Sequence, residues 1–178
     1  MTTSLKDYVQ KLLEEHRGER VFRFEYLGKH YWLKQPEQLK GIWLLLKPYP
    51  KQHFKEECEI LQHLNNIGAP VPKLCGFGDD YLVLEDAGPT LNIWLNDETL
   101  SWAEKSHILH SAIEILINLH QKGIIHGRPA IRDIAWKEGK ITFMDFESHS
   151  KSHNEHWLIT RDMLAFLDSL CRVKSLDD

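Results

Sequence analysis

Hydrophobic and polar residues follow two different periods along this chain, and the first part of it favours strands. Apolar residues at helical spacing over residues 5–16 predict a short amphipathic helix at the start. Alternation over residues 21–26, a turn sequence at 27–30 and a second strand-forming run at 31–35 then predict a β-hairpin. Lys34 lies near the end of this hairpin.

A helix and a buried strand complete this first half. Residues 42–46 are a candidate for a third strand, because they are apolar and prolines follow them. The apolar side chains of residues 52–66 recur at helical spacing, and Gly68 ends the predicted helix. Residues 81–85 are expected to form a buried strand, and residues 86–89 connect it to the second half.

The second half favours helices. Ser101 and Glu104 have the spacing of a capping box, and the apolar pattern after them predicts a long helix. Residues 133–146 predict a second hairpin that turns at residues 137–140. Residues 157–173 predict a final helix.

This order of elements predicts an α+β protein made of two lobes. A strand-rich N-terminal lobe is expected over residues 1–86, and a helical C-terminal lobe with a late hairpin over residues 87–178. Of the 178 residues, 42% are hydrophobic and 27% are charged, which is enough apolar material for one core or for two small lobes that share an interface.

Composition narrows the cellular location of the protein and its possible partners. The longest apolar runs are far shorter than the roughly 20 residues that cross a bilayer, and the N-terminal sequence lacks the pattern of a signal peptide. Three widely spaced cysteines favour reduced thiols and a cytoplasmic location. A net charge of -4 indicates no general affinity for nucleic acid. Membrane contact, if there is any, is expected to be peripheral and through the helix at 5–16, for which packing on the N-terminal lobe is the favoured role.

One segment carries most of the candidate chemistry. In chain order it contains His126-Gly127-Arg128, then Asp133, then Asp145-Phe146-Glu147. Asp145 follows an apolar strand, and Asp133 stands twelve positions earlier across the predicted hairpin, so two carboxylates are expected at one place. Such oxygen ligands suit Mg²⁺ and nucleotide phosphates, whereas an Asp that caps a turn is the simpler alternative.

This segment resembles the catalytic loop of the kinase-like superfamily. In protein kinases and their small-molecule-phosphorylating relatives, a His-Arg-Asp or His-Gly-Asp triplet precedes an Asn, a short hairpin and a metal-binding Asp-Phe-Gly. The resemblance covers about residues 21–170 and is closest to small bacterial lipopolysaccharide (Kdo/WaaP-type) kinases, with RIO-type kinases and aminoglycoside phosphotransferases more distant. It implies a two-lobed protein-kinase-like fold with a minimal C-terminal lobe.

The resemblance assigns roles to residues of the first half. It implies that ATP and Mg²⁺ are the cofactors, that Lys34 contacts the nucleotide phosphates and that Glu57 holds this lysine. Lys47 and Glu59 are the alternatives for these two positions. Glu85 marks the expected hinge, where backbone groups meet the adenine ring, although an ordinary buried strand has the same pattern.

The resemblance also assigns roles in the second half. It makes Asp133 and Asp145 the metal-binding residues. It implies that His126 braces the catalytic loop by packing and hydrogen bonding, with a catalytic base as the alternative role. Asp162 corresponds to a residue that accepts hydrogen bonds from the backbone of this loop, and simple surface exposure is the alternative.

Arg128 is the main departure from the family pattern, because it stands where the family has its catalytic Asp. A guanidinium stays protonated at working pH and cannot accept the proton of a substrate hydroxyl. We therefore expect Arg128 to neutralise phosphate charge while Asp133 or Glu147 orients the acceptor. No glycine-rich loop precedes Lys34, and Glu147 replaces the glycine of the metal motif.

Two hypotheses about function follow from these residues. The first is an ATP- and magnesium-dependent phosphotransferase that acts on a saccharide, a glycolipid or another hydroxyl acceptor. The second is a pseudokinase, a nucleotide-binding or regulatory interaction module without catalysis, and Arg128 favours it. A purely structural interaction domain is a third hypothesis, which the absence of nucleotide binding would distinguish.

Overall fold

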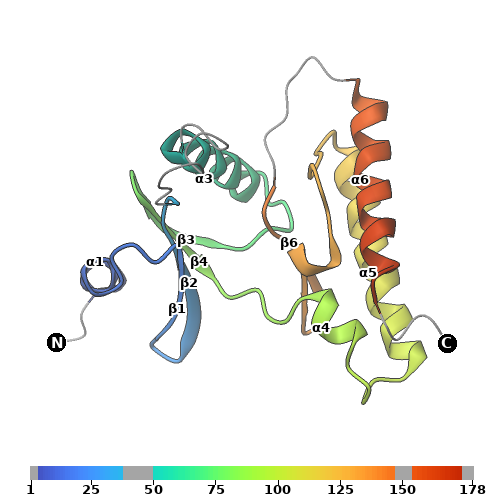
Figure 1. The fold of residues 1–178 in the computed structure, drawn as a ribbon, viewed down its shortest axis with the longest axis horizontal. Coiled ribbons are helices and arrows are strands. Elements are labelled where there is room, and N and C mark those ends of the chain that lie inside the picture. The colour runs from blue at the N-terminus through green and yellow to red at the C-terminus, as the bar shows by residue number, and fades with distance from the viewer. Residues whose placement is uncertain (1–3, 38–49, 147–153, 174–178) are drawn as a thin grey trace. The chain divides into compact units, whose positions relative to one another are not determined.

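The computed structural model describes residues 4–37, 50–146 and 154–173, and the chain forms two compact units (Figure 1). Unit 1 comprises residues 1–63 and 72–86, and unit 2 comprises residues 64–71 and 87–178. The elements of the described residues are, in chain order, α1 (Leu5–Glu15), β1 (Val21–Tyr26), β2 (Lys29–Lys34), α3 (Pro50–Asn66), β3 (Leu74–Gly78), β4 (Tyr81–Glu85), α4 (Leu91–Leu95), α5 (Trp102–Gln121), the 3₁₀ helix η1 (Ile131–Asp133), β5 (Ile134–Lys137), β6 (Lys140–Phe143) and α6 (Glu155–Leu170).

Unit 1 contains a four-stranded antiparallel sheet with the strand order β1-β2-β4-β3. A two-residue turn joins β1 to β2, and both of its residues, Leu27 and Gly28, have a positive φ, of 51° and 72°. This is the backbone conformation of the tight turns that match the twist of paired strands. The predicted hairpin is confirmed, and its turn is shorter than expected because Lys29 already pairs with Tyr26.

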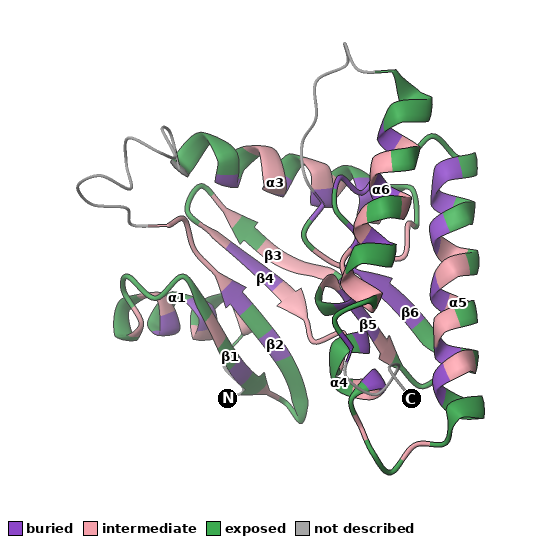
Figure 2. Ribbon diagram, turned by 45° about the vertical axis from the view of Figure 1, so that its right-hand side comes forward, coloured by how far each residue is buried: buried purple, intermediate pink, exposed green. Residues whose placement is uncertain are grey.

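Alternation along β2 places neighbouring side chains on opposite faces of the sheet. Tyr31 and Leu33 belong to a buried core cluster with the apolar side of α1, which confirms that α1 packs on this unit (Figure 2). Lys34 follows Leu33 directly, so its side chain leaves the sheet on the other face. There it meets Glu57 of α3.

The other elements of unit 1 differ partly from the prediction. α3 begins two residues earlier than expected and ends where expected, whereas the candidate strand at 42–46 lies outside the described residues. β3 was not predicted, because its sequence Leu74-Cys-Gly-Phe-Gly78 lacks apolar alternation. It pairs with β4 through a register irregularity between Leu74 and Gly76.

In unit 2 the predicted helices and hairpin are confirmed. α5 begins with the capping box of Ser101 and Glu104, and α6 begins after Asn154, whose side chain accepts a hydrogen bond from His156 N. The β5–β6 hairpin turns at Glu138 and Gly139, both with positive φ.

The short helix α4 was not predicted, since one turn is too short for an apolar period to show. It anchors the hairpin. Trp94 donates a hydrogen bond from Nε1 to Trp136 O at 3.0 Å, and the two rings meet at 89° with their centroids 5.0 Å apart. Trp136 N donates to Pro89 O at 3.0 Å. These contacts hold β5 against α4 and the residue Pro89 that precedes it.

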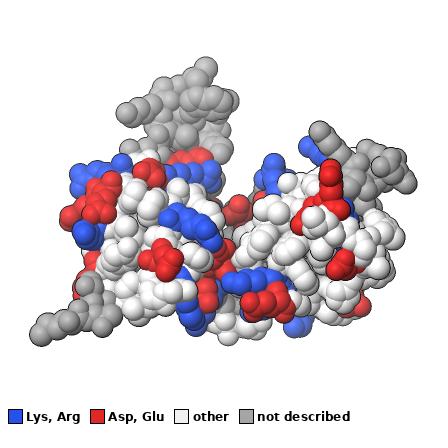
Figure 3. Space-filling view, turned by 90° about the horizontal axis from the view of Figure 1, so that it is seen from below, with Lys and Arg blue, Asp and Glu red and all other residues white. Residues whose placement is uncertain are grey.

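The surface charges and the cysteines of the described residues do not indicate a particular partner. In the described part of the chain, no helix is long and apolar enough to cross a membrane. Basic and acidic side chains lie interspersed on the face drawn in Figure 3. All three cysteines are free.

We expect Ser101→Ala to destabilise the protein by about 1 kcal/mol. Its hydroxyl accepts from Glu104 N, while Ser101 N donates to Glu104 Oε2 at 2.8 Å, so the substitution leaves a helix-end amide without its acceptor. Ser111→Ala is the matched control, because this hydroxyl only donates to His107 O within the same helix. Urea unfolding followed by circular dichroism measures both. Equal losses in the two variants would contradict the capping role.

Candidate functional site

Lys34 and Glu57 form an ion pair between β2 and α3 in unit 1. Lys34 Nζ contacts Glu57 Oε1, and the two side chains are only 12% and 23% exposed. Partial burial strengthens this pair relative to one in water. The alternative Glu59 is 64% exposed and pairs with Lys55 at 3.9 Å, whereas Lys47 lies outside the described residues. The structure therefore has the lysine–glutamate contact that the kinase resemblance implies.

A pocket of about 300 Å³ opens beside this ion pair. Its size is at the lower end of the range for small-ligand pockets. Arg20 and Glu37 in its wall form an ion pair at 2.7 Å, and Phe54 supplies apolar surface. The lining residues are Arg20, Lys34, Gln35, Glu37, His53, Phe54 and Glu57.

Glu85, the predicted hinge residue, ends β4 and is tied into the sheet. Its side chain pairs with Lys29 Nζ at 3.7 Å, and its backbone N donates to Lys73 O at 2.9 Å. The next amide, Asp86 N, donates to His30 O at 3.0 Å. Both amide hydrogens already have acceptors inside unit 1, so they are not available to an adenine ring.

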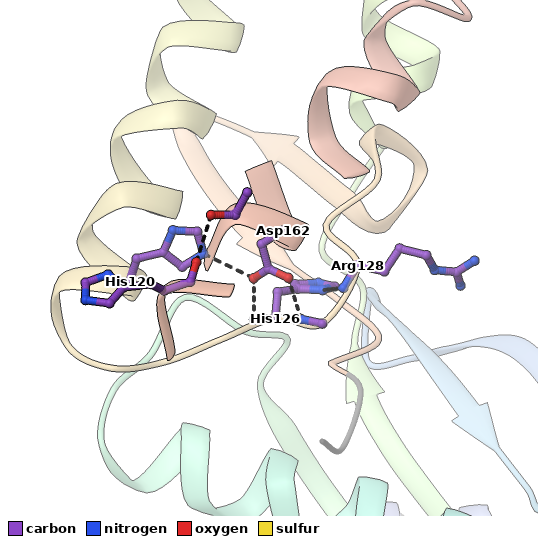
Figure 4. Close-up of polar contacts among 7 residues, drawn as sticks. His120, His126, Arg128 and Asp162 are labelled. Atoms are coloured by element: carbon purple, nitrogen blue, oxygen red, sulfur yellow. Dashed lines mark hydrogen bonds and ion pairs between the residues drawn. The ribbon is translucent and has the colours of Figure 1, made fainter. Parts of the chain in front are cut away.

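In unit 2 the buried carboxylate of Asp162 organises the loop that resembles a catalytic loop (Figure 4). It accepts hydrogen bonds from His126 N at 2.8 Å and from Gly127 N at 2.9 Å. The ring nitrogen Nε2 of His120 lies 3.1 Å from the same carboxylate. The predicted bracing role of Asp162 is confirmed, and the alternative of surface exposure is wrong because its exposed fraction is 0%.

His126 uses both nitrogens of its ring inside the fold. Nε2 lies 2.7 Å from Met144 O, and Nδ1 accepts a hydrogen bond from Arg128 N at 3.3 Å. This pattern requires a neutral ring with its proton on Nε2. The ring also packs against Phe143 and Phe146, with centroids 5.8 and 4.5 Å apart. His126 therefore braces the loop by packing and hydrogen bonding, as the resemblance implies.

Arg128 occupies the position that holds an Asp in kinase-like enzymes. Its residue is exposed, and its side chain extends away from the cluster of His120, His126 and Asp162 (Figure 4). After Arg128 the loop makes a tight turn, in which Ala130 N donates a hydrogen bond to Arg128 O at 2.9 Å. The backbone is thus held as a catalytic loop would be, while the charge that it presents has the opposite sign.

Asp133 and Asp145 are brought together by the β5–β6 hairpin. Met144 N donates to Asp133 O at 2.8 Å, and the next residue, Asp145, has a φ of 57°, a conformation that Asp tolerates better than most residues. Burial and the nearby Asp145 carboxylate raise the pKa of Asp133, and Arg132 and Arg128 offset part of this rise. Arg132 Nε lies 3.7 Å from Asp133 Oδ2.

A pair of carboxylates that repel each other fits a divalent cation. The described residues contain no group of three or more His, Cys, Asp or Glu side chains that would enclose a metal. Mg²⁺ does not need one, because it commonly takes one or two carboxylates and completes its shell with phosphate and water oxygens. Asp133 and Asp145 thus suit Mg²⁺ on a nucleotide. Glu147, the third predicted acidic residue, lies outside the described residues.

Two residues of this site were not identified from the sequence. His120 lies on the buried side of α5, where a lone histidine looks like an ordinary core residue. Arg132 precedes Asp133 directly, and this adjacency was a signal that could have been used.

Comparison with known proteins identifies the family. The family model of the RIO domain matches residues 47–173, and RIO domains are protein-kinase-like. The chain therefore belongs to the RIO domain family. The sequence resemblance had placed RIO-type kinases further away than lipopolysaccharide kinases, and the match is to the RIO domain. The expected α+β, two-lobed kinase-like fold class is confirmed.

The chain is also similar to a curated relative. A protein of Haemophilus influenzae, described as an uncharacterized protein, is 51% identical over 173 residues. These residues are 97% of this chain and 72% of the relative. RIO domains typically bind ATP with Mg²⁺, so the chain is a member of a kinase-like, ATP-binding family.

Asp162→Asn is expected to cost about 3 kcal/mol, because an amide NH₂ replaces one acceptor oxygen and leaves a buried backbone N–H without a partner. Asp168→Asn is the control on the same helix. Asp168 is 64% exposed and pairs with Arg172, and such surface pairs contribute about 0–1 kcal/mol. Urea unfolding measures the difference. A cost for Asp162→Asn no larger than that of the control would refute the bracing role.

Asp133→Asn is expected to raise the melting temperature at pH 7. The raised pKa means that folded Asp133 keeps its proton to a higher pH than the unfolded chain does, so this group lowers stability as pH rises through its folded-state pKa. Well below the unfolded-state pKa of about 3.9 both states are protonated, and the gain of the variant should disappear.

Asp97→Asn should behave in the opposite way. Hydrogen bonds from the Thr99 hydroxyl and amide lower the pKa of Asp97, so its carboxylate stabilises the fold at neutral pH, and this effect is lost in acid. Thermal unfolding followed from about pH 2 to pH 8 tests both variants, because the Asp97 effect is lost only below the ordinary Asp pKa of about 3.9. A stability gain of Asp133→Asn that does not change with pH would contradict the electrostatic explanation.

Proposed function

We propose that this protein binds ATP with Mg²⁺ and transfers a phosphoryl group to a small hydroxyl-bearing acceptor in the cytoplasm. The observation that carries this proposal is the pair of carboxylates Asp133 and Asp145, whose mutual repulsion a bound cation would relieve. Membership of the RIO domain family and the Lys34–Glu57 ion pair support it. The sequence resemblance to lipopolysaccharide kinases supports a saccharide or glycolipid as the acceptor.

The residues take the following roles. In unit 1, Lys34 binds nucleotide phosphates and Glu57 keeps its ammonium group in place. In unit 2, Asp133 and Asp145 hold the cation, and Arg128 offsets phosphate charge. When bound, Mg²⁺ neutralises charge that develops on the transferred phosphoryl group. Asp133 or Glu147 orients the acceptor hydroxyl. Its oxygen forms the new bond to phosphorus as the bond to ADP breaks, and its proton is released to solvent.

A pseudokinase is the second candidate, and Arg128 is the observation that favours it. Loss of a general base commonly lowers the rate by about 10²–10⁴-fold, whereas positioning and electrostatic stabilisation remain. A slow transferase and a nucleotide-binding regulator therefore share the same binding site residues. Formation of ADP that depends on an added acceptor distinguishes them.

Calorimetric titration with ATP, with and without MgCl₂, tests the binding step. We expect wild-type binding to require Mg²⁺, and Asp145→Asn to weaken it about tenfold or more, because the negative charge of one ligand is lost. Glu57→Gln should also weaken it, whereas Glu59→Gln, two residues along α3 and exposed, should bind like wild type. Magnesium-independent binding that Asp145→Asn leaves unchanged would refute the proposed metal site. No binding at millimolar ATP would leave a structural domain of kinase-like fold.

A further inference from the structure

A second pocket lies wholly within unit 2 and differs in character from the first. Its volume is about 310 Å³, and it is bordered by α4, by the segment from Arg128 through η1, and by the C-terminal part of α6. Three of its lining residues, Ala130, Ile131 and Ala165, are small or apolar. Its polar lining residues are Asn92, Arg128, Arg132, Asp168, Ser169 and Arg172.

The charge of this lining is opposite to that of the whole chain. Three guanidinium groups face one carboxylate, in a protein whose net charge is -4. One of them has a local explanation, since Arg172 pairs with Asp168 at 2.6 Å near the end of α6, where a cation is favourable. Arg128 and Arg132 come from a different part of the chain. Local helix chemistry does not explain why three arginines border one cavity.

The wall of the pocket is held in place by its neutral residues. Ser169 Oγ accepts a hydrogen bond from Ile131 N at 3.1 Å and donates one to Phe166 O at 2.6 Å. These bonds tie η1, which carries Arg132, to α6, which carries Asp168 and ends two residues before Arg172. The backbone beside Arg132 is therefore held to α6, so this arginine approaches the pocket from an ordered segment.

We propose that this pocket binds the phosphate group of a small-molecule phosphomonoester. A guanidinium presents a planar fork of five donors that matches phosphate oxygens, so Arg172 can contact a ligand while it keeps its bond to Asp168. The excess of positive over negative groups in the lining suits a dianion better than a singly charged carboxylate. The volume fits a phosphate with a small attached group.

This ligand site goes beyond the proposed nucleotide-binding function, and it connects to it through two shared residues. Arg128 and Arg132 line the pocket and also act on Asp133, the predicted metal-binding residue. A phosphomonoester bound in the pocket would pair with these two guanidinium groups and weaken their effect on Asp133. The pocket thus places a phosphorylated small molecule beside the residue on which the proposed chemistry depends.

The experiment is a calorimetric titration of the full chain with glucose 6-phosphate, in EDTA and without nucleotide. We expect binding at about millimolar ligand and none with glucose. Arg132→Gln and Arg172→Gln should each weaken binding about tenfold or more, since each removes charge-assisted hydrogen bonds. Arg172→Lys should fall between wild type and Arg172→Gln, because charge is kept and the fork is lost. Arg17→Gln, an exposed arginine of unit 1, is the matched control.

The outcomes separate this proposal from the nucleotide proposal. Asp145→Asn should bind glucose 6-phosphate like wild type, so a failure to bind ATP leaves this test intact. The inference is overturned if glucose 6-phosphate does not bind, or if the two glutamine variants bind it as tightly as Arg17→Gln. It is also overturned if inorganic phosphate and sulfate bind as tightly as glucose 6-phosphate, because the pocket would then select a free anion and not a phosphomonoester.

Discussion

The buried carboxylate of Asp162 is the interaction on which the functional half of this protein depends. A charged group with no exposed surface is costly unless donors surround it, and here two backbone amides and one histidine ring do so. Because both amides belong to the loop at His126 and Gly127, the same bonds that satisfy the carboxylate also fix the loop. His126 in turn contacts Met144 O, so the loop is also connected to the residue that follows β6.

The carboxylates of Asp133 and Asp145 present the opposite situation. Asp162 is surrounded by donors, whereas Asp133 is half-buried next to a like charge, and its pKa is raised as a result. A neutral side chain at either position would avoid this repulsion. The Asp133–Asp145 pair lowers stability, and it lies next to a loop that Asp162 holds in place. This combination is typical of a binding site.

Local chemistry determined which parts of the fold were predictable. The Ser101–Glu104 capping box and the glycine turn at Gly139 have signals within a few residues, and both are confirmed. β3 and α4 lack such signals, because one contains two glycines and the other is a single turn. Asp162 was identified through the resemblance to kinases, because hydrophobic periodicity carries no information on a buried polar residue. The arginine pocket joins residues about forty positions apart, and proximity of that kind is not written in any local pattern.

Arg128 is easier to understand when its surroundings are considered together. An Asp at this position would add a third carboxylate beside Asp133 and Asp145, and it would raise the pKa of Asp133 further. Arginine lowers that pKa, so the replacement eases the repulsion between Asp133 and Asp145. The same guanidinium lines the pocket that also holds Arg132 and Arg172. A single change of sign therefore makes the carboxylate pair less dependent on a bound cation and makes the neighbouring cavity attractive to anions. Both effects agree with the proposed roles of this region, in which electrostatic attraction contributes more than proton transfer.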